Sequence, residues 1–529
     1  MAAMAQATRA DGGARPATPA DDCELARLSR WRRPALLVSP AAAVAAVTVV
    51  AIALRWPTLM GPSFWVDEWV TRNLVSLPLL DMLRGVRETE STPPLYYVLG
   101  WGWAHIFGTS EFALRSLSAL FGAAMVPVTY AAASALATRR VGLIAASFVA
   151  FNPLLVWYST EARAYALLLL LVATTLLFFA RALAKPRAQP LLLWSLAGAA
   201  ALTTHYFAVF VVAAEALALL FVRRSHRRAV ALALVPIAAI GLALLPLVYW
   251  QRDNPAWIED LALVGRLLEV PRDFAVGVSE PSEGLVVVVG LLVGAALLLL
   301  VRADRRERHA AAIALAVGAL SLALPMAVAV VRDYLLARNL LVSWLPLALL
   351  VAVGCGVRRA GAAGVAVAAG LCGAWLAVII NVASDERLQR ADWKQAGRLI
   401  GDAPRDRLVL AWSDWGASPL GDELARARRV GQGESARVAE VVLLGADRPP
   451  GRSCWSGAAC NITDAPLAGA ISLPGFALVD RRRSGLFEVL RFRTRRPVRL
   501  SWETVSKVEP ASVPAVWLQR RSVRAGAGG

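Results

Sequence analysis

The chain has 529 residues, of which 57% are hydrophobic and only 18% are charged, and its mean hydropathy is +0.55. This composition is too apolar for an ordinary water-soluble globule and indicates a protein that crosses a membrane several times. The formal net charge of +18 does not indicate a nucleic-acid partner. The arginines stand in short clusters between apolar runs, as they do in cytoplasmic loops.

Residues 1–33 are polar and rich in Ala, Arg and Pro, so we expect a disordered cytoplasmic N-terminus. They are long for the leading part of a cleaved signal peptide, and the apolar run 34–54 therefore indicates a signal anchor that is retained. Further apolar runs follow, most of them close to the roughly 20 residues that cross a bilayer core. We assign 34–383 to one transmembrane domain, in which 55–112 forms a first external loop that carries the catalytic residues.

Six basic clusters predict the topology. They are Arg30/Arg32/Arg33, Arg139/Arg140, Arg181/Lys185/Arg187, Arg223/Arg224/Arg227/Arg228, Arg302/Arg305/Arg306/Arg308 and Arg358/Arg359. Because such clusters favour the cytoplasmic side, an even number of crossings must separate successive ones. Eleven candidate spans meet this condition, at 35–54, 113–137, 141–157, 164–182, 190–204, 206–222, 229–249, 285–301, 310–330, 340–357 and about 360–380. We therefore expect an inner or plasma membrane protein with a cytoplasmic N-terminus and an extracytoplasmic C-terminal domain.

One apolar segment, 93–107, is left over from this count. It runs for only about 15 residues and is rich in Tyr and Trp, which suits the membrane interface. If it crossed, the basic clusters that follow would lie on the wrong side. We expect a helix on the outer membrane surface, with a tilted span as the alternative.

The segment FWVDEWVT places Asp67 and Glu68 directly after the first apolar run. Glu68 precedes Arg72 by four residues, a spacing at which opposite charges on a helix can pair. Asp67 has Thr71 at that spacing, so Asp67 is the acid more available to serve as general base for an acceptor hydroxyl. The alternative is that both acids are only solvated surface groups.

The stretch YSTEARAYA lies at the predicted outer end of a span and holds Tyr158, Glu161, Arg163 and Tyr165. The planar guanidinium of Arg163 is suited to an anionic phosphate. Glu161 is expected either to orient Arg163 or to contact a sugar hydroxyl. The structural alternative is an interfacial anchor made of tyrosines and a snorkelling arginine.

Further polar residues fall on the same predicted face. THYF holds His205 and Tyr206, and RDYLLAR holds Arg332 and Arg338, while Arg115 stands near the start of the second span. Arginines are disfavoured on this side, and we expect at least one of them to bind a phosphate. A lone His is more often a structural residue than a ligand. No His, Cys and Asp cluster has metal-ligand spacing, so we expect no cofactor, and a divalent metal is left open.

The composition changes after the last apolar run. Residues 384–529 alternate the helix-like ADWKQAGRLI with strand-like RLVLAW, AEVVLLGA and GFALVDRRRSGLFEVLRFRT, which predicts a soluble α/β or α+β domain. Cys454 and Cys460 bracket a short loop there and either form a small disulfide or stay free. Cys355 and Cys372 lie in apolar helices, where we expect them to be packing residues.

The ordered motifs resemble the GT-C glycosyltransferases, specifically the protein O-mannosyltransferase and aminoarabinose-transferase superfamily (glycosyltransferase family 39). The resemblance covers roughly 35–400 and rests on DE, PPLYY, FALRSLSALFG, NPLLVWYSTEARAYAL, THYF, a late arginine-bearing segment and ADWKQAG. It implies a GT-C-like fold and transfer of a sugar from a polyprenyl-phosphate donor, with inversion at the anomeric carbon. It also implies that the first acid of the pair, Asp67, is the base. Thr92 departs from the basic residue often found before PPL, and Ala164 replaces the Pro of EARPY.

We therefore predict a glycosyltransferase that moves a hexose or pentose, mannose-like or other, to an acceptor hydroxyl on the extracytoplasmic face. Asp67 and Glu68 form the catalytic pair, and Arg163, with Arg115, Arg332 or Arg338, stabilises the departing phosphate. The expected partners are the lipid-linked donor, a glycan, lipid or protein acceptor, and membrane lipids, without nucleic acid. One rival is a flippase for a lipid-linked glycan, which favours deeply buried charges and discontinuous helices in repeated halves. The other is a non-catalytic cell-envelope assembly protein, for which the acids are dispensable.

Overall fold

The computed structural model describes residues 39–279, 282–411, 417–446, 473–508 and 514–522. The predicted disordered segment 1–33 and the cysteine pair Cys454 and Cys460 lie outside these ranges. Cys355 and Cys372 are free thiols in apolar helices, and Cys355 is buried.

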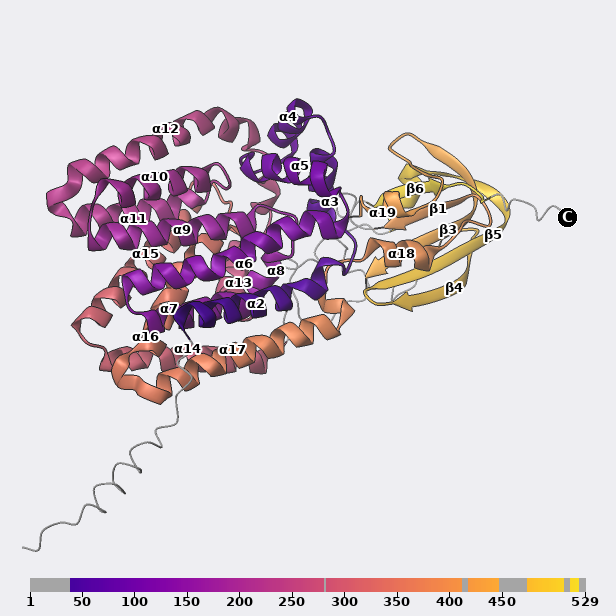
Figure 1. Cartoon of the computed structure of the whole chain (residues 1–529). Coiled ribbons are helices and arrows are strands. Elements are labelled where there is room, and N and C mark those ends of the chain that lie inside the picture. The colour runs from indigo at the N-terminus through magenta and orange to yellow at the C-terminus, as the bar shows by residue number, and fades with distance from the viewer. Residues whose placement is uncertain (1–38, 280–281, 412–416, 447–472, 509–513, 523–529) are drawn as a thin grey trace, which may run out of the picture. The chain divides into compact units, whose positions relative to one another are not determined.

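Helices make up the chain as far as Ser384 (Figure 1). They are α2 (Pro40–Leu59), α3 (Val66–Val75), α4 (Leu79–Thr89), α5 (Leu95–Phe107), α6 (Glu111–Leu136), α7 (Arg139–Phe151), α8 (Pro153–Ser159), α9 (Tyr165–Ala184), α10 (Ala188–Leu202), α11 (Ala208–Val222), α12 (Arg227–Gln251), α13 (Leu263–Val276), α14 (Glu283–Leu299), α15 (Arg305–Ala329), α16 (Trp344–Gly356) and α17 (Gly361–Ser384). The described residues contain eight helices long and apolar enough to cross a membrane, or nine if the bent pair of α7 and α8 is one span. The chain is thus a multi-pass membrane protein, as its composition predicted.

Each of the eleven predicted spans coincides with a helix or a bent helix pair. The shortfall in the count comes from α10 and α11, which have 15 residues each, fewer than the roughly 20 that a crossing needs. The predicted helices are therefore confirmed, whereas the predicted number of crossings is not.

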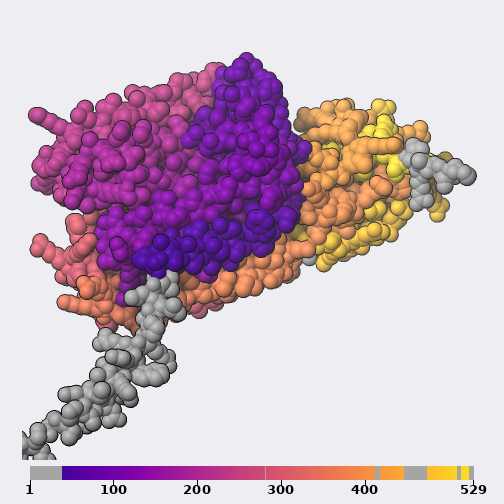
Figure 2. Space-filling view, in the orientation of Figure 1, coloured from indigo at the N-terminus to yellow at the C-terminus, as the bar shows by residue number. Residues whose placement is uncertain are grey.

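The outer helices present their apolar side chains to the surroundings. Only 11% of the most apolar window is buried in each of the segments that contain α12 and α14, against 72% for α9. Leu232 on α12 and Leu291 on α14 are 72% and 69% exposed. Such surfaces are stable against acyl chains and costly in water. Side chains fill the spaces between the helix ribbons on the face seen in Figure 2.

The break between α7 and α8, bent by 60°, arises at Pro153. Proline has no N–H, so the carbonyl of Val149, four residues earlier, loses its helical donor. Arg55, buried on α2, supplies donors in its place: Nη2 lies 3.2 Å from Val149 O, and Nη1 lies 3.2 Å from Ala150 O. The bend leads the chain into the loop 160–164, which carries two of the predicted site residues.

The segment left over from the span count forms α5, a helix of 13 residues. At 1.5 Å per residue it is about 20 Å long, shorter than the roughly 30 Å hydrocarbon core of a bilayer. The predicted helix is confirmed, and its place on the membrane surface stays a prediction.

The chain after Ser384 forms a six-stranded sheet of order β2-β6-β1-β3-β5-β4. The elements are α18 (Trp393–Ile400), β1 (Arg407–Ala411), α19 (Leu420–Glu423), β2 (Ala427–Arg429), β3 (Ser435–Ala446), β4 (Ala477–Ser484), β5 (Phe487–Ser501), α20 (Trp502–Val505) and β6 (Ala515–Gln519). β1 and β3 pair in parallel and the other neighbours are antiparallel. This mixed sheet confirms the predicted α/β or α+β fold.

Successive residues of β1 serve opposite faces of this sheet. Val409 packs with Trp393 of α18 in one apolar cluster, and Leu410 packs with Val505 of α20 in another. Both faces are therefore covered, which explains why all five residues of β1 are buried.

Candidate active site

Glu68, on the first turn of α3, is buried beside Arg115 of α6. Arg115 donates from Nε to Glu68 Oε1 at 2.8 Å and from Nη2 to Oε2 at 2.6 Å, and its Nη1 and Nη2 also donate to the carbonyls of Pro62 and Ser63. The backbone N–H of Ala162 gives Glu68 a third donor at 2.9 Å. Burial opposes ionisation of Glu68, but Arg115 outweighs it and holds the pKa of this carboxyl below its usual value. Glu68 is therefore a buried anion that joins α3, α6 and the loop 160–164.

The predicted pairing of Glu68 with Arg72 is wrong. Arg72 instead lies with its Nη1 2.9 Å from Asp422 Oδ2 of α19, and both side chains are more than a third exposed. Four of the five N–H donors of Arg115 serve Glu68 and backbone carbonyls, so this arginine has little left to offer a phosphate.

Asp67, which has no oppositely charged residue four positions on, pairs instead with a residue distant in the chain. Its Oδ2 lies 3.3 Å from Nη1 of Arg338, which precedes the short 3-10 helix η5 (Asn339–Ser343). The side chains of Arg338 and Asp67 are 24% and 21% exposed. This carboxylate is sheltered and paired, yet it is reachable by a substrate.

Arg163 forms a forked ion pair with Glu90, which the sequence interpretation missed. Nη1 and Nη2 of Arg163 lie 2.9 Å and 2.7 Å from the two carboxylate oxygens of Glu90. Nη1 also lies 3.2 Å from Thr71 Oγ1 and 3.4 Å from the backbone carbonyl of Asp67. The two-pronged geometry is the one in which arginine binds a carboxylate most strongly. Arg163 thus holds the start of α3 against the end of α4.

The loop that carries Glu90 is held by residues at and just after the end of α12. Gln251 donates from Nε2 to the carbonyl of Thr92 at 3.2 Å, and Asn254 donates from Nδ2 to the carbonyl of Glu90 at 2.7 Å. Tyr206 donates its hydroxyl to Gln251 Oε1 at 2.7 Å. Tyr206, a predicted binding residue, therefore acts on this loop through Gln251.

Aromatic rings line the same region. The ring centroids of Tyr158 and Tyr165 are 4.8 Å apart, and those of Tyr165 and His205 are 6.0 Å apart. Burial, with the positive charges of Arg163 and Arg338, lowers the pKa of His205 to about 3. The imidazole is therefore neutral at physiological pH.

Glu161 is buried and pairs with Arg390, in the segment between α17 and α18. Arg390 Nη2 lies 3.0 Å from Glu161 Oε2, and its guanidinium carbon lies 4.2 Å from the ring centroid of Trp157. Burial raises the pKa of Glu161 to about 7, although Arg390 lowers it. Glu161 does not pair with the side chain of Arg163, as one of the two predicted roles required. Arg390 was not found from the sequence.

Arg332 lies apart from this group. Its ion pairs are with Asp253, at 2.7 Å, and Glu259, at 3.5 Å, and its side chain is 37% exposed. Among the described residues it makes no hydrogen bond or ion pair with Asp67.

The side chains that come together are thus Asp67, Arg338, Tyr158, Tyr165, Glu161, Arg163 and His205. Glu68 and Arg115 form the buried ion pair of this region. Across the ranges that the structure describes, no group of three or more His, Cys, Asp or Glu residues could hold a metal ion. The arrangement offers a carboxylate that can accept a proton and a guanidinium that can neutralise a leaving anion.

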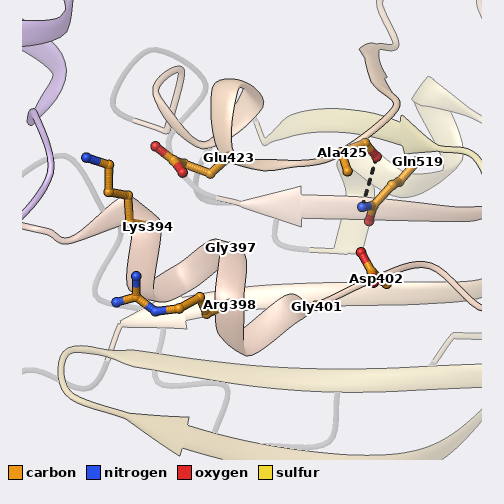
Figure 3. A pocket seen from close by; sticks show the side chains of 8 residues that line it. All are labelled: Lys394, Gly397, Arg398, Gly401, Asp402, Glu423, Ala425 and Gln519. Atoms are coloured by element: carbon orange, nitrogen blue, oxygen red, sulfur yellow. Dashed lines mark hydrogen bonds between the residues drawn. The ribbon is translucent and has the colours of Figure 1, made fainter. Parts of the chain in front are cut away.

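A cavity of about 460 Å³ lies in the C-terminal domain, and Asp67 does not line it. It is lined by residues of both charge signs, among them Lys394 and Arg398 of α18, Asp402 and Glu423 (Figure 3). None of the predicted catalytic residues reaches it, so the cavity does not mark the chemistry that the motifs predict.

Comparison of sequences supports the predicted resemblance. Residues 91–250 match the family described as dolichyl-phosphate-mannose-protein mannosyltransferase. This stretch contains the PPLYY turn, Arg115, YSTEARAYA and THYF. No curated protein matches the chain.

Solved structures give similar chain traces at low identity. ArnT from Cupriavidus metallidurans in the apo state is 14% identical, with a TM-score of 0.49 over 85% of this chain and 97% of that one. The same protein bound to undecaprenyl phosphate gives 14% and 0.47 over the same shares. An oligosaccharyltransferase from Archaeoglobus fulgidus is 13% identical, with a TM-score of 0.45 over 68% and 58%. The chain is thus similar over residues 91–250 to the family described as dolichyl-phosphate-mannose-protein mannosyltransferase.

Proposed function

We propose that the chain is a membrane glycosyltransferase that moves a sugar from a polyprenyl-phosphate donor to an acceptor hydroxyl, with inversion. The observation that carries the proposal is the sheltered pair of Asp67 and Arg338, a base beside a cation, with Oδ2 and Nη1 3.3 Å apart. The description of the matched family names dolichyl-phosphate mannose, a sugar carried on a polyprenyl phosphate, which supports a lipid-linked donor.

Asp67 acts as the general base in this proposal. Its carboxylate takes the proton from the acceptor hydroxyl while the acceptor oxygen attacks the anomeric carbon. The bond between that carbon and the phosphate oxygen breaks, and the electron pair leaves with the polyprenyl phosphate. Attack from the face opposite the phosphate gives inversion. Nη1 of Arg338, 3.3 Å from Oδ2 of Asp67, holds this carboxylate in place.

Arg338 is also the arginine best placed to receive the phosphate. A guanidinium has five donors, and among the described residues Arg338 makes one hydrogen bond, to Asp67. By contrast, Arg163 donates hydrogen bonds to both carboxylate oxygens of Glu90, and Arg115 donates to both carboxylate oxygens of Glu68. The leading phosphate contact therefore moves from Arg163 to Arg338, and Arg163 keeps a supporting role through its contact with the backbone of Asp67.

Transfer is tested directly with purified protein in proteoliposomes. Radiolabelled polyprenyl-phosphate mannose and a panel of other polyprenyl-phosphate sugars are supplied with an extract of cell-envelope acceptors, and labelled product is separated from lipid. We expect product with at least one donor. Label that crosses the bilayer without forming product would identify a flippase, and no transfer from any donor would contradict the proposal.

A further inference from the structure

Glu161 has one oxygen with no protein partner. Its Oε2 accepts from Arg390, whereas no hydrogen-bond partner reaches the buried Oε1 from the described residues. The residue is 1% exposed. A buried acceptor without a donor costs free energy, and such exceptions need an explanation.

The carboxylate is held in one orientation by Arg390. The Nη2 of Arg390 donates both to Glu161 Oε2, at 3.0 Å, and to the carbonyl of Trp157, at 2.9 Å. Its guanidinium also stacks on the Trp157 ring, so this arginine has little freedom to move. With Oε2 fixed, the direction of Oε1 is fixed as well.

Glu161 lies among the groups of the proposed site. The charged or titratable side chains that interact with it electrostatically are Asp67 and Glu68 of α3, Tyr96 of α5, Arg115 of α6, Tyr158 of α8, Tyr165 of α9, Arg338 and Arg390. Oε1 of an ionised carboxylate only accepts hydrogen bonds, so an anionic ligand without a proton cannot satisfy it. A neutral donor such as a hydroxyl satisfies the oxygen without adding negative charge.

We infer that Glu161 binds a substrate hydroxyl through Oε1, and that Arg390 is the positioning residue that orients it. This inference rests on the proposed transferase function. The hydroxyl comes either from the sugar of the donor or from the acceptor. The segment between α17 and α18 thereby contributes a residue to a site whose other members come from the chain before Ser384.

The pH dependence of transfer tests both roles. If Glu161 accepts a hydrogen bond as an anion, kcat/KM falls as the pH drops below about 7, because burial raises its pKa to about 7. This fall is the acid limb of the pH profile, and Glu161→Gln removes it. The same variant lowers kcat/KM by about 10- to 100-fold, the equivalent of one hydrogen bond to a charged group. Arg390→Gln removes a positive charge that lowers the pKa, so the limb moves to higher pH. Arg390→Lys keeps the charge and leaves the limb close to the wild-type position.

The control is Arg407→Gln, which breaks a buried ion pair of the C-terminal sheet, with Glu440 at 3.1 Å, and should leave the limb in place. Folding is checked by the thermal midpoint in detergent. If Glu161→Gln raises the KM for the donor, the hydroxyl belongs to the donor sugar. If it raises the KM for the acceptor, the hydroxyl belongs to the acceptor.

Two outcomes would show that the inference is wrong while the proposed transfer stands. One is that Glu161→Gln keeps the wild-type rate and the wild-type fall at acid pH. The other is that Arg390→Gln and Arg390→Lys give this fall at the same pH. If the wild type transfers nothing, the proposed function itself fails.

Discussion

Arg338 and Asp67 are 271 residues apart in the chain, yet Nη1 of the arginine lies 3.3 Å from Oδ2 of the aspartate. The contact joins α3, in the segment between α2 and α6, to the start of a late membrane helix. The other two arginines of the site, Arg115 and Arg163, are taken up by Glu68 and Glu90. The pair therefore combines a reachable base with an arginine that still has donors to offer.

Arg338→Gln should lower kcat/KM for transfer by about 100-fold, the usual cost of removing one donor that stabilises developing negative charge. It should also weaken inhibition by sugar-free polyprenyl phosphate. The matched control is Arg332→Gln, since Arg332 pairs with Asp253 and is 37% exposed. Equal losses in the two variants would argue against phosphate binding by Arg338.

Glu68→Gln should destabilise the fold because it leaves Arg115 buried without its anion. Removing one partner of a buried ion pair typically costs about 3–5 kcal/mol, so the thermal midpoint in detergent should fall clearly. Asp422→Asn is the control, since the exposed pair of Arg72 and Asp422 should contribute only about 0–1 kcal/mol. A midpoint that falls no further for Glu68→Gln than for the control would contradict this structural role.

The same ion pair predicts acid sensitivity. Arg115 holds the pKa of Glu68 below its usual value of 4.5, so the pair stabilises the fold above that pH. The stability is lost as the pH falls through the lowered pKa, when Glu68 takes up a proton. Thermal midpoints of wild type and Glu68→Gln, measured from pH 7 to pH 3, should therefore converge at the acid end. Parallel curves would show that Glu68 does not titrate with unfolding.

His205 should not set the pH dependence of transfer. Its pKa is lowered to about 3, so the imidazole is neutral throughout the range in which enzymes are usually assayed. A limb near pH 7 should therefore survive in His205→Gln at an unchanged position, whatever the rate of that variant. Loss of the limb in His205→Gln would assign it to the histidine and not to Glu161.

Local patterns predicted the helices well because an apolar run of membrane length is a local property. The helix pair α7 and α8 shows where this stops. The Asn152–Pro153 step signals a break, but the compensating donors come from Arg55, nearly a hundred residues earlier. The break could have been predicted from Pro153, whereas the donors that stabilise it could not, because they come from a distant residue.

The residue types of the candidate site were found from sequence, and their pairing was not. The i, i+4 rule assigned Glu68 to Arg72, whereas burial of the inner face of α3 turns Glu68 toward Arg115. Burying a carboxylate requires a partner of opposite charge, and that requirement outweighs a weak surface pair. Glu90 and Arg390 went unnoticed because their partners, Arg163 and Glu161, are brought to them only by the fold.

The central claim is that Asp67 is the base for sugar transfer, and one comparison tests it most directly. Asp67→Asn and Asp81→Asn each remove one negative charge from the segment between α2 and α6, and Asp81 is an exposed acid paired with Arg84. With a transferable polyprenyl-phosphate sugar, Asp67→Asn should lower kcat by about 10²- to 10⁴-fold, the contribution of a general base, whereas Asp81→Asn should keep the wild-type rate. Transfer by Asp67→Asn at the rate of Asp81→Asn would contradict the mechanism.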